Sequence, residues 1–123
     1  MIGYVTLGTN DIARAAAFYD ALLAELNAKR TMEFPTFIAW GSSPTGVSLC
    51  VIKPHDGNVA TGGNGTMVAL AADSKATVDR VYKKAMELGA KDEGPAGPRG
   101  DTYYAGYFRD PDGNKLNIFY SGT

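Results

Sequence analysis

Apolar and polar residues recur with two different periods along this chain. In residues 12–26 the apolar side chains lie three and four positions apart, which predicts a helix with one buried face. In residues 114–120 apolar and polar residues alternate, which predicts a strand that follows the turn-forming sequence Asp110-Pro111-Asp112-Gly113. Asn117 lies near the middle of this strand, on the face opposite Leu116 and Ile118.

The same two periods place eight strands and two helices along the chain. The predicted strands are residues 1–7, 29–34, 36–41, 46–53, 66–71, 91–93, 103–109 and 114–120, and the predicted helices are residues 12–26 and 73–88. Thr9, Asn10 and Asp11 are candidate caps at the start of the first helix, and Asp73 or Ser74 is the candidate cap of the second. Asn27 is expected to cap the end of the first helix, and Gly89 fits the left-handed position that ends the second. A turn at residues 42–44 separates the third strand from the fourth.

The predicted order of elements, β-α-β-β-β, occurs twice, and the two copies align residue by residue. A shift of 63 places residues 4–7 on residues 67–70. Late in each half the shift becomes 67, and it pairs Phe37 with Tyr104, Trp40 with Tyr107, Leu49 with Leu116, and Cys50 with Asn117. Each copy is too small to bury its own sheet face, so the copies are expected to pack against each other or against another chain.

These patterns predict an α+β fold in a single domain, residues 1–123, with modules at 1–53 and 66–123. The linker at 54–65 is rich in Gly, Asn, Asp and Thr. Residues 94–102 are rich in Gly and Pro, and we expect them to form a flap that carries Arg99.

Composition narrows the classes of partner. The chain has 123 residues, 45% of them hydrophobic, and 12 basic and 13 acidic residues give a net charge of −1. No basic stripe for nucleic acid and no apolar run of membrane-spanning length occurs. The single cysteine, Cys50, cannot pair within its chain, and we expect a cytoplasmic protein with a small molecule or a protein as its partner.

The repeat, with the Phe18-Tyr19 pair and the turn at 109–114, resembles the vicinal oxygen chelate superfamily over essentially the whole chain. That superfamily includes glyoxalase I, bleomycin-resistance proteins and extradiol dioxygenases. The resemblance implies two tandem βαβββ modules whose strands form a curled mixed sheet, a half-open barrel with the helices outside. It also implies a cup for a small molecule, commonly completed in a homodimer.

The resemblance further implies four strand positions around a divalent metal ion. In this chain they are Tyr4, Cys50, Met67 and Asn117. The family's enzymes typically have His at the first and third of these positions and Glu at the fourth. A phenol, a thiol, a thioether and an amide are a poor ligand set for such an ion. We therefore expect no metal and no other cofactor, and whether any reaction is catalysed stays open.

The same four positions are expected to line a ligand pocket. Thr6 and Ala69 lie two residues further along on the same strand faces, Arg99 is a candidate from the flap, and Trp40 and Tyr104 are the preferred aromatic walls. The predicted ligand-binding residues are Tyr4, Thr6, Trp40, Cys50, Met67, Ala69, Arg99, Tyr104 and Asn117. The only histidine, His55, is expected to be a surface residue of the linker.

Our first hypothesis is therefore binding of a small molecule in the barrel cup, as in bleomycin-resistance proteins, without the family metal site. One alternative is a metal-dependent glyoxalase I-like lyase or a dioxygenase with ligands that the alignment misplaces. Another is a vestigial cup in a protein that acts through a protein-interaction surface. A homodimer is expected, with no nucleic acid and no membrane as partner.

Overall fold

The computed structural model of the chain describes residues 1–43 and 45–122. The turn predicted at 42–44 includes Pro44, which lies outside the described residues. The elements are β1 (Tyr4–Gly8), α1 (Ile12–Ala24), β2 (Lys29–Phe34), β3 (Phe37–Gly41), β4 (Ser48–Ile52), β5 (Val68–Ala71), α2 (Lys75–Glu87), β6 (Lys91–Pro98), β7 (Tyr103–Arg109) and β8 (Lys115–Ser121). The predicted α+β fold with two βαβββ modules is confirmed, and most predicted bounds are within two residues of these.

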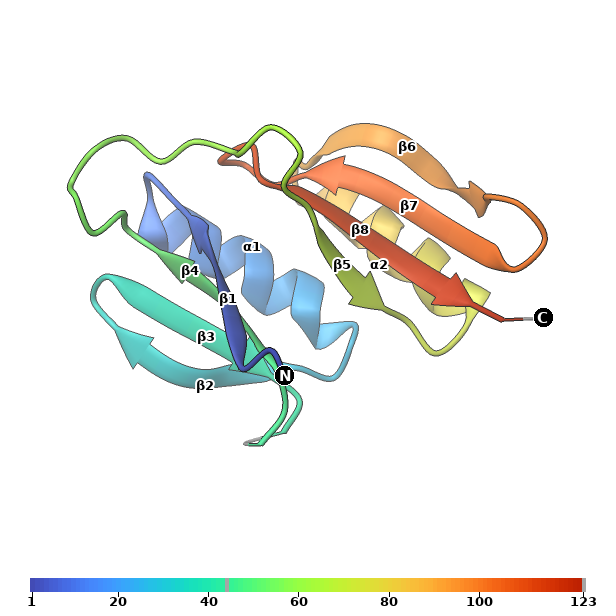
Figure 1. The fold of residues 1–123 in the computed structure, drawn as a ribbon, viewed down its shortest axis with the longest axis horizontal. Helices are drawn as coiled ribbons and strands as arrows, with labels where there is room; N and C mark the ends of the chain where they lie inside the picture. The colour runs from blue at the N-terminus through green and yellow to red at the C-terminus, as the bar shows by residue number, and fades with distance from the viewer. Residues whose placement is uncertain (44, 123) are drawn as a thin grey trace.

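Each module forms its own four-stranded mixed sheet. The strand orders are β1-β4-β3-β2 and β5-β8-β7-β6, and β1 and β5 pair in parallel with β4 and β8 respectively. The two sheets lie side by side, with β1 and β5 toward the middle (Figure 1). Among the described residues, no Cα atom of a strand in one sheet lies within 8 Å of a strand in the other. The sheets therefore do not close into one barrel.

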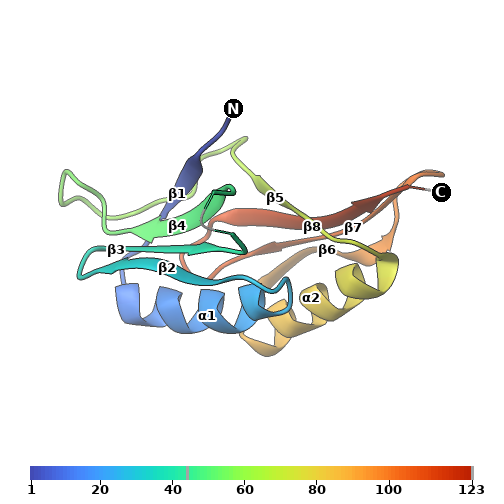
Figure 2. The same cartoon turned by 90° about the horizontal axis from the view of Figure 1, so that it is seen from below.

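Both helices lie on the same side of the two sheets (Figure 2). Each sheet thus has a helix face, which packs against a helix, and an open face on the other side. Alternate strand residues such as Val51, Phe108, Leu116 and Ile118 are fully buried in the core on the helix face. Burial of each such side chain stabilises the fold by about 1.5–3 kcal/mol. Neither helix is long and apolar enough to cross a membrane, in the part of the chain that the structure describes.

The helix ends use local polar groups, as the sequence predicts. Asp11 accepts a hydrogen bond from the Arg14 backbone N–H, 3.0 Å away, and Ser74 does the same for Thr77 at the start of α2. After α1, Asn27 has φ 60°, and after α2 Gly89 has φ 90°. The prediction of a left-handed Gly89 is confirmed, and Asn27, predicted to end the first helix, is left-handed as well.

The predicted flap is shorter than expected because β6 continues through its Gly- and Pro-rich part. Residues 94–98 pair with β7, with interruptions of the register on both sides of Gly94. Gly94 has φ 151°, a conformation that favours glycine. Since β6 is an edge strand, Pro95 and Pro98 interrupt no interior ladder. Only residues 99–102 remain as a loop between β6 and β7.

The segment between β4 and β5 is held against both modules. The Asn10 side chain donates a hydrogen bond to the Ala60 carbonyl and accepts one from the Ala60 N–H, at 3.1 and 2.7 Å. A Cβ atom on Gly62 would lie 2.5 Å from the Gly113 carbonyl oxygen. Only glycine therefore lets this segment pass so close to the turn between β7 and β8.

That turn also joins the two modules through a buried carboxylate, which we call the Asp110 clasp. Asp110 Oδ2 accepts hydrogen bonds from the Tyr19 hydroxyl of α1 at 2.6 Å and from Asn114 Nδ2 at 2.9 Å. Asp110 Oδ1 accepts the backbone N–H groups of Asp112 and Asn114. Asn114 Nδ2 also donates to the Gly8 carbonyl of β1. One carboxylate thus orders the turn before β8 and attaches it to the first module.

We expect Tyr19→Phe to lower the free energy of unfolding by about 1.5–3 kcal/mol, because it removes a donor from a buried carboxylate. Burial, with the Asp110 carboxylate beside it, raises the pKa of Tyr19 well above its ordinary value. Tyr82 is the equivalent residue of α2, and its hydroxyl donates to the exposed Asp92 at 2.7 Å. Urea unfolding should give a loss below about 1 kcal/mol for Tyr82→Phe, the matched control. Equal losses in the two variants would contradict the proposed importance of the clasp.

Candidate ligand-binding site

Strand pairing arranges the open face of the first sheet in rows that run across the strands. Residues paired across neighbouring strands point to the same face, and successive rows are two residues apart along each strand. The first row consists of Lys29, Gly41, Ser48 and Tyr4. The second row consists of Met32, Ala39, Cys50 and Thr6. Both rows face away from α1, because the residues between them, such as Trp40 and Leu49, belong to the core.

A pocket of about 660 Å³ lies over these two rows. Its apolar lining comes from Tyr4, Met32, Phe37, Ala39 and Cys50, and its polar lining includes Asn27, Lys29, Thr31, Ser42, Ser43 and Ser48. The rings of Tyr4 and Phe37 meet edge to face, with their centroids 6.4 Å apart. Because β4 lies between the strands that carry them, the two rings meet over β4.

Cys50 lies at the base of this pocket and is buried. Burial raises the pKa of its thiol above the ordinary value. A thiol that stays protonated near neutral pH is a weak nucleophile and a weak metal ligand. Cys50 therefore serves as a small apolar surface, as its strand position suggests.

The open face of the second sheet carries an unpaired amide at Asn117. Asn117 is 0% exposed, and neither its Oδ1 nor its Nδ2 has a hydrogen-bond partner among the described residues. It lies between Ala69 of β5 and Tyr107 of β7. An unpaired polar group in a buried position costs about 1–3 kcal/mol. The amide is therefore a candidate contact for a ligand or a partner chain.

The structure divides the predicted residues between the two open faces. Tyr4 and Cys50 line the pocket, and Thr6 pairs with Cys50 on the same face without lining it. On the second sheet Ala69 pairs with Asn117, while Met67 directly precedes β5 and is 41% exposed. The four positions of the family metal site thus lie on two separate sheets of this chain.

Trp40 and Tyr104 lie on the helix faces, so their prediction as pocket walls is wrong. Trp40 is 1% exposed, and its indole Nε1 donates to Asp20 of α1 at 2.8 Å. The Tyr104 hydroxyl donates to Asp79 of α2 at 2.6 Å. In each case the ring packs between the sheet and the helix, and its polar atom donates a hydrogen bond to a carboxylate of that helix.

The cause of this error is a slip of one residue in the repeat alignment of β3 and β7. Trp40 is opposite Leu49 and Phe108 is opposite Leu116, so Trp40 is equivalent to Phe108 and not to Tyr107. In a strand, a shift of one residue moves every side chain to the opposite face. The pairing of Cys50 with Asn117 in β4 and β8 is consistent with the observed registers.

In β3 and β7, Phe37 and Tyr107 lie on the open faces instead, as does Tyr103, whose ring stacks on that of Phe119 of β8. Alternation with Ile38 and Phe108, which are buried apolar residues, is the sequence signal that identifies Phe37 and Tyr107. Arg99 lies over Tyr107, with its guanidinium carbon 5.6 Å from the ring centroid, and donates to the carbonyl oxygens of Pro95, Gly97 and Pro98. Arg99 therefore packs on the second sheet and its own loop, and does not line the pocket of the first sheet.

The side chains at the family metal positions do not fit a divalent metal ion. They supply a phenol, a neutral thiol, a thioether and an amide, whereas such ions are bound by carboxylate, imidazole or thiolate groups. In residues 1–43 and 45–122, no group of three or more His, Cys, Asp or Glu side chains could hold a metal ion. The side chains at these four positions are uncharged or weakly polar.

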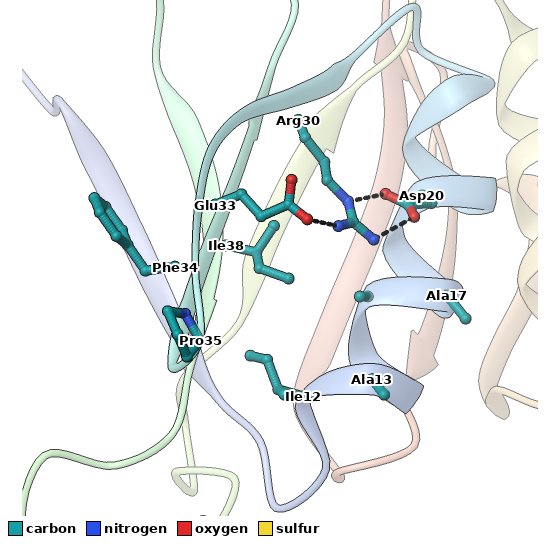
Figure 3. Close-up of a pocket in the computed structure, with 10 residues that line it drawn as sticks. Ile12, Ala13, Ala17, Asp20, Arg30, Glu33, Phe34, Pro35 and Ile38 are labelled. Atoms are coloured by element: carbon teal, nitrogen blue, oxygen red, sulfur yellow. Dashed lines mark hydrogen bonds and ion pairs between the residues drawn. The ribbon is translucent and has the colours of Figure 1, made fainter.

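A second pocket, of about 570 Å³, lies between α1 and the β2–β3 hairpin (Figure 3). Small side chains of α1, including Ala13 and Ala17, form one wall. Arg30 donates from Nε and Nη2 to the two oxygens of Asp20, at 2.9 and 2.7 Å, and from Nη1 to Glu33 (Figure 3). This pairing lowers the pKa of Asp20. Since the charged groups of Arg30, Asp20 and Glu33 already pair with one another, this pocket is a weaker candidate for a ligand site than the pocket on the open face of the first sheet.

Comparisons with known proteins identify the family. The profile of the Glyoxalase/Bleomycin resistance protein/Dioxygenase superfamily matches residues 1–118, so the chain belongs to this superfamily. A glyoxalase/bleomycin resistance protein from Albidiferax ferrireducens T118 is 32% identical, with 98% of each chain covered and a TM-score of 0.89. The resemblance stated from the sequence is thereby confirmed.

More distant structures share the fold. A glyoxalase/bleomycin resistance protein/dioxygenase family enzyme from Burkholderia phytofirmans PsJN is 19% identical, with 97% of each chain covered and a TM-score of 0.78. Lactoylglutathione lyase from Agrobacterium tumefaciens is 21% identical over 98% of this chain and 92% of its own, with a TM-score of 0.71. No curated protein matches the chain.

We expect Trp40 fluorescence to be poorly quenched by iodide, because the indole is buried between β3 and α1. A matched variant, Trp40→Phe with Phe37→Trp, moves the only tryptophan to the open face. Quenching should be several times stronger in this variant, provided that its circular dichroism is unchanged. Equal quenching constants for the two folded proteins would contradict the assignment of Trp40 to the helix face.

Proposed function

We propose that this protein binds a small, partly aromatic or amphipathic molecule on the open face of its first sheet, without the metal ion of the family's enzymes. The pocket of about 660 Å³ over Cys50 and Ala39 is the observation that carries this proposal. Ligand pockets commonly have this size and combine an apolar lining with a few polar groups. The Tyr4–Phe37 ring pair supports a planar apolar group in the ligand.

The side chains at the family metal positions are poor ligands for the metal ion of the family's enzymes. Tyr4, Met67 and Asn117 replace the His, His and Glu that the family resemblance implies, and the Cys50 thiol is protonated because burial raises its pKa. A metal-dependent lyase or dioxygenase reaction would need other donors.

We also infer a homodimer, in which a second copy covers part of the open faces. Tyr4 and Met32 are 63% and 49% exposed, and Met67 is exposed beside the second sheet. Exposed apolar side chains gathered on one side of a protein are typical of an interaction surface. The unpaired amide of Asn117 on the same side supports the inference.

The test of binding is thermal unfolding with a panel of planar aromatic and amphipathic compounds. A compound at one hundred times its Kd should stabilise the protein by about 2.7 kcal/mol. Gly41→Val should abolish this gain, because a Cβ at Gly41 has ordinary contacts of 3.4–3.7 Å and the added methyl groups extend into the pocket. Ala17→Val fills the pocket of Figure 3 instead and should leave the gain unchanged. A gain that survives Gly41→Val and is lost in Ala17→Val would contradict the proposed site.

The metal-free part of the proposal has its own test. Elemental analysis of the dialysed protein should show far less than one equivalent of zinc, nickel, iron or manganese. Addition of each ion should leave the melting temperature unchanged, since a bound ion would stabilise the folded state. A full equivalent of retained metal would favour the metal-dependent alternative.

Sedimentation velocity at micromolar concentrations should show a dimer. Met67→Glu should weaken it, because the variant introduces a charge on the side of the molecule that we expect a second copy to cover. Val59→Glu places the same charge on an exposed apolar residue of the segment between β4 and β5, and should leave the dimer intact. A monomer at every concentration would contradict the inference of a dimer.

A further inference from the structure

The pocket on the first sheet changes from polar to apolar along its strands. The first row presents the Lys29 ammonium, the Ser48 hydroxyl and the Tyr4 phenol, while the second presents Ala39, Cys50 and Met32. Adjacent rows on one face are about 6.7 Å apart, which is the rise of two residues in a strand. A ligand longer than this spacing would therefore contact both kinds of surface at once.

Gly41 keeps the first row open. It lies opposite Lys29 on the neighbouring strand, and it has no side chain to fill the space between Lys29 and Ser48. A Cβ added there would lie 3.4 Å from the Ser48 oxygen. Lys29 and Ser48 thus lie on the two sides of Gly41 in this row, and both line the pocket.

Within residues 1–43 and 45–122, Lys29 is the only charged residue that lines the pocket. Among the described residues it forms no ion pair, whereas Arg30 on the same strand is paired with Asp20 and Glu33. In the part of the chain that the structure describes, no carboxylate lines the pocket, so the pocket offers no formal negative charge to a cationic ligand. An unpaired ammonium at one end of an apolar pocket favours a negatively charged group there.

We propose that the ligand is an amphipathic anion, with its acidic group beside Lys29 and Ser48 and its planar apolar part over Ala39 and against the Tyr4–Phe37 ring pair. This inference rests on the proposed function, because it assigns a ligand class to the same pocket. A carboxylate, a sulfonate or a phosphate would satisfy it, since each is an anionic group that accepts hydrogen bonds from an ammonium and a hydroxyl.

The test uses two fluorescent probes that differ in charge. Anilinonaphthalene sulfonate carries an anionic group on an aromatic body, and N-phenyl-naphthylamine has the same aromatic body without that group. We expect the anionic probe to bind more tightly than the neutral one. Lys29→Gln should lower the affinity for the anionic probe by about fivefold, which is the upper range for an exposed ion pair. The affinity for the neutral probe should change little.

Matched variants separate this inference from the proposed function. Lys83→Gln removes one positive charge from the exposed surface of α2 and should leave the affinity for both probes unchanged. Lys29→Arg should retain the preference for the anion. Gly41→Val should lower the affinity for both probes, because the valine side chain fills the pocket itself. Circular dichroism and the melting temperature establish that each variant is folded before its titration is compared with the wild type.

Two results would overturn the inference in different ways. Suppose that Gly41→Val lowers the affinity for both probes and Lys29→Gln changes neither affinity. The pocket is then the binding site, and the preference for an anion is wrong. If Gly41→Val changes the affinity for neither probe, the proposed site itself is wrong, and the inference is wrong with it. Equal affinity of the wild type for the two probes would also contradict the anionic ligand class.

Discussion

The buried carboxylate of Asp110 is the interaction on which the arrangement of the two modules depends. It accepts hydrogen bonds from Tyr19 of the first module and from the backbone and Asn114 of its own turn, and Asn114 in turn holds the Gly8 carbonyl. A carboxylate is stable in such a buried position only when several donors surround it. Because the strands of the two sheets do not approach each other, this turn and the contact between α1 and α2 determine how the modules lie. Both open faces consequently lie on the same side of the molecule (Figure 2).

That arrangement distributes the four family metal positions between the two halves of this chain. Two of them lie on the first sheet and two on the second, and the sheets lie side by side instead of face to face. The consequence for chemistry is that each open face has its own character. The first has an apolar pocket with a cation at one end, and the second has a buried amide without a partner. The core of large apolar side chains lies on the other side of both sheets.

The site also shows how a single register decides which residues act together. Lys29, Gly41 and Ser48 are separated by turns along the sequence, and only the pairing of β2, β3 and β4 brings them into one row. The repeat alignment was right for β4 and β8, whose core residues Leu49 and Leu116 are alike. It was wrong by one residue for β3 and β7, where aromatic residues occur on both faces. A pattern in which both faces carry similar side chains leaves the register open, and for this reason the sequence predicts the wrong face for Trp40 and Tyr104.

Periodicity, capping residues and turn residues are local properties of the chain, and they are sufficient to predict the α+β class, the duplicated βαβββ order and most element bounds. The family resemblance adds the cup positions Tyr4, Cys50, Met67 and Asn117, and strand alternation extends them to Thr6 and Ala69. The hydrogen bond from Trp40 to Asp20, the extension of β6 to Pro98 and the place of Lys29 beside the pocket emerge only in the folded chain. Those features depend on pairing between strands that are distant in the sequence, and the physical reason they escape prediction is that no local pattern records which strand lies beside which.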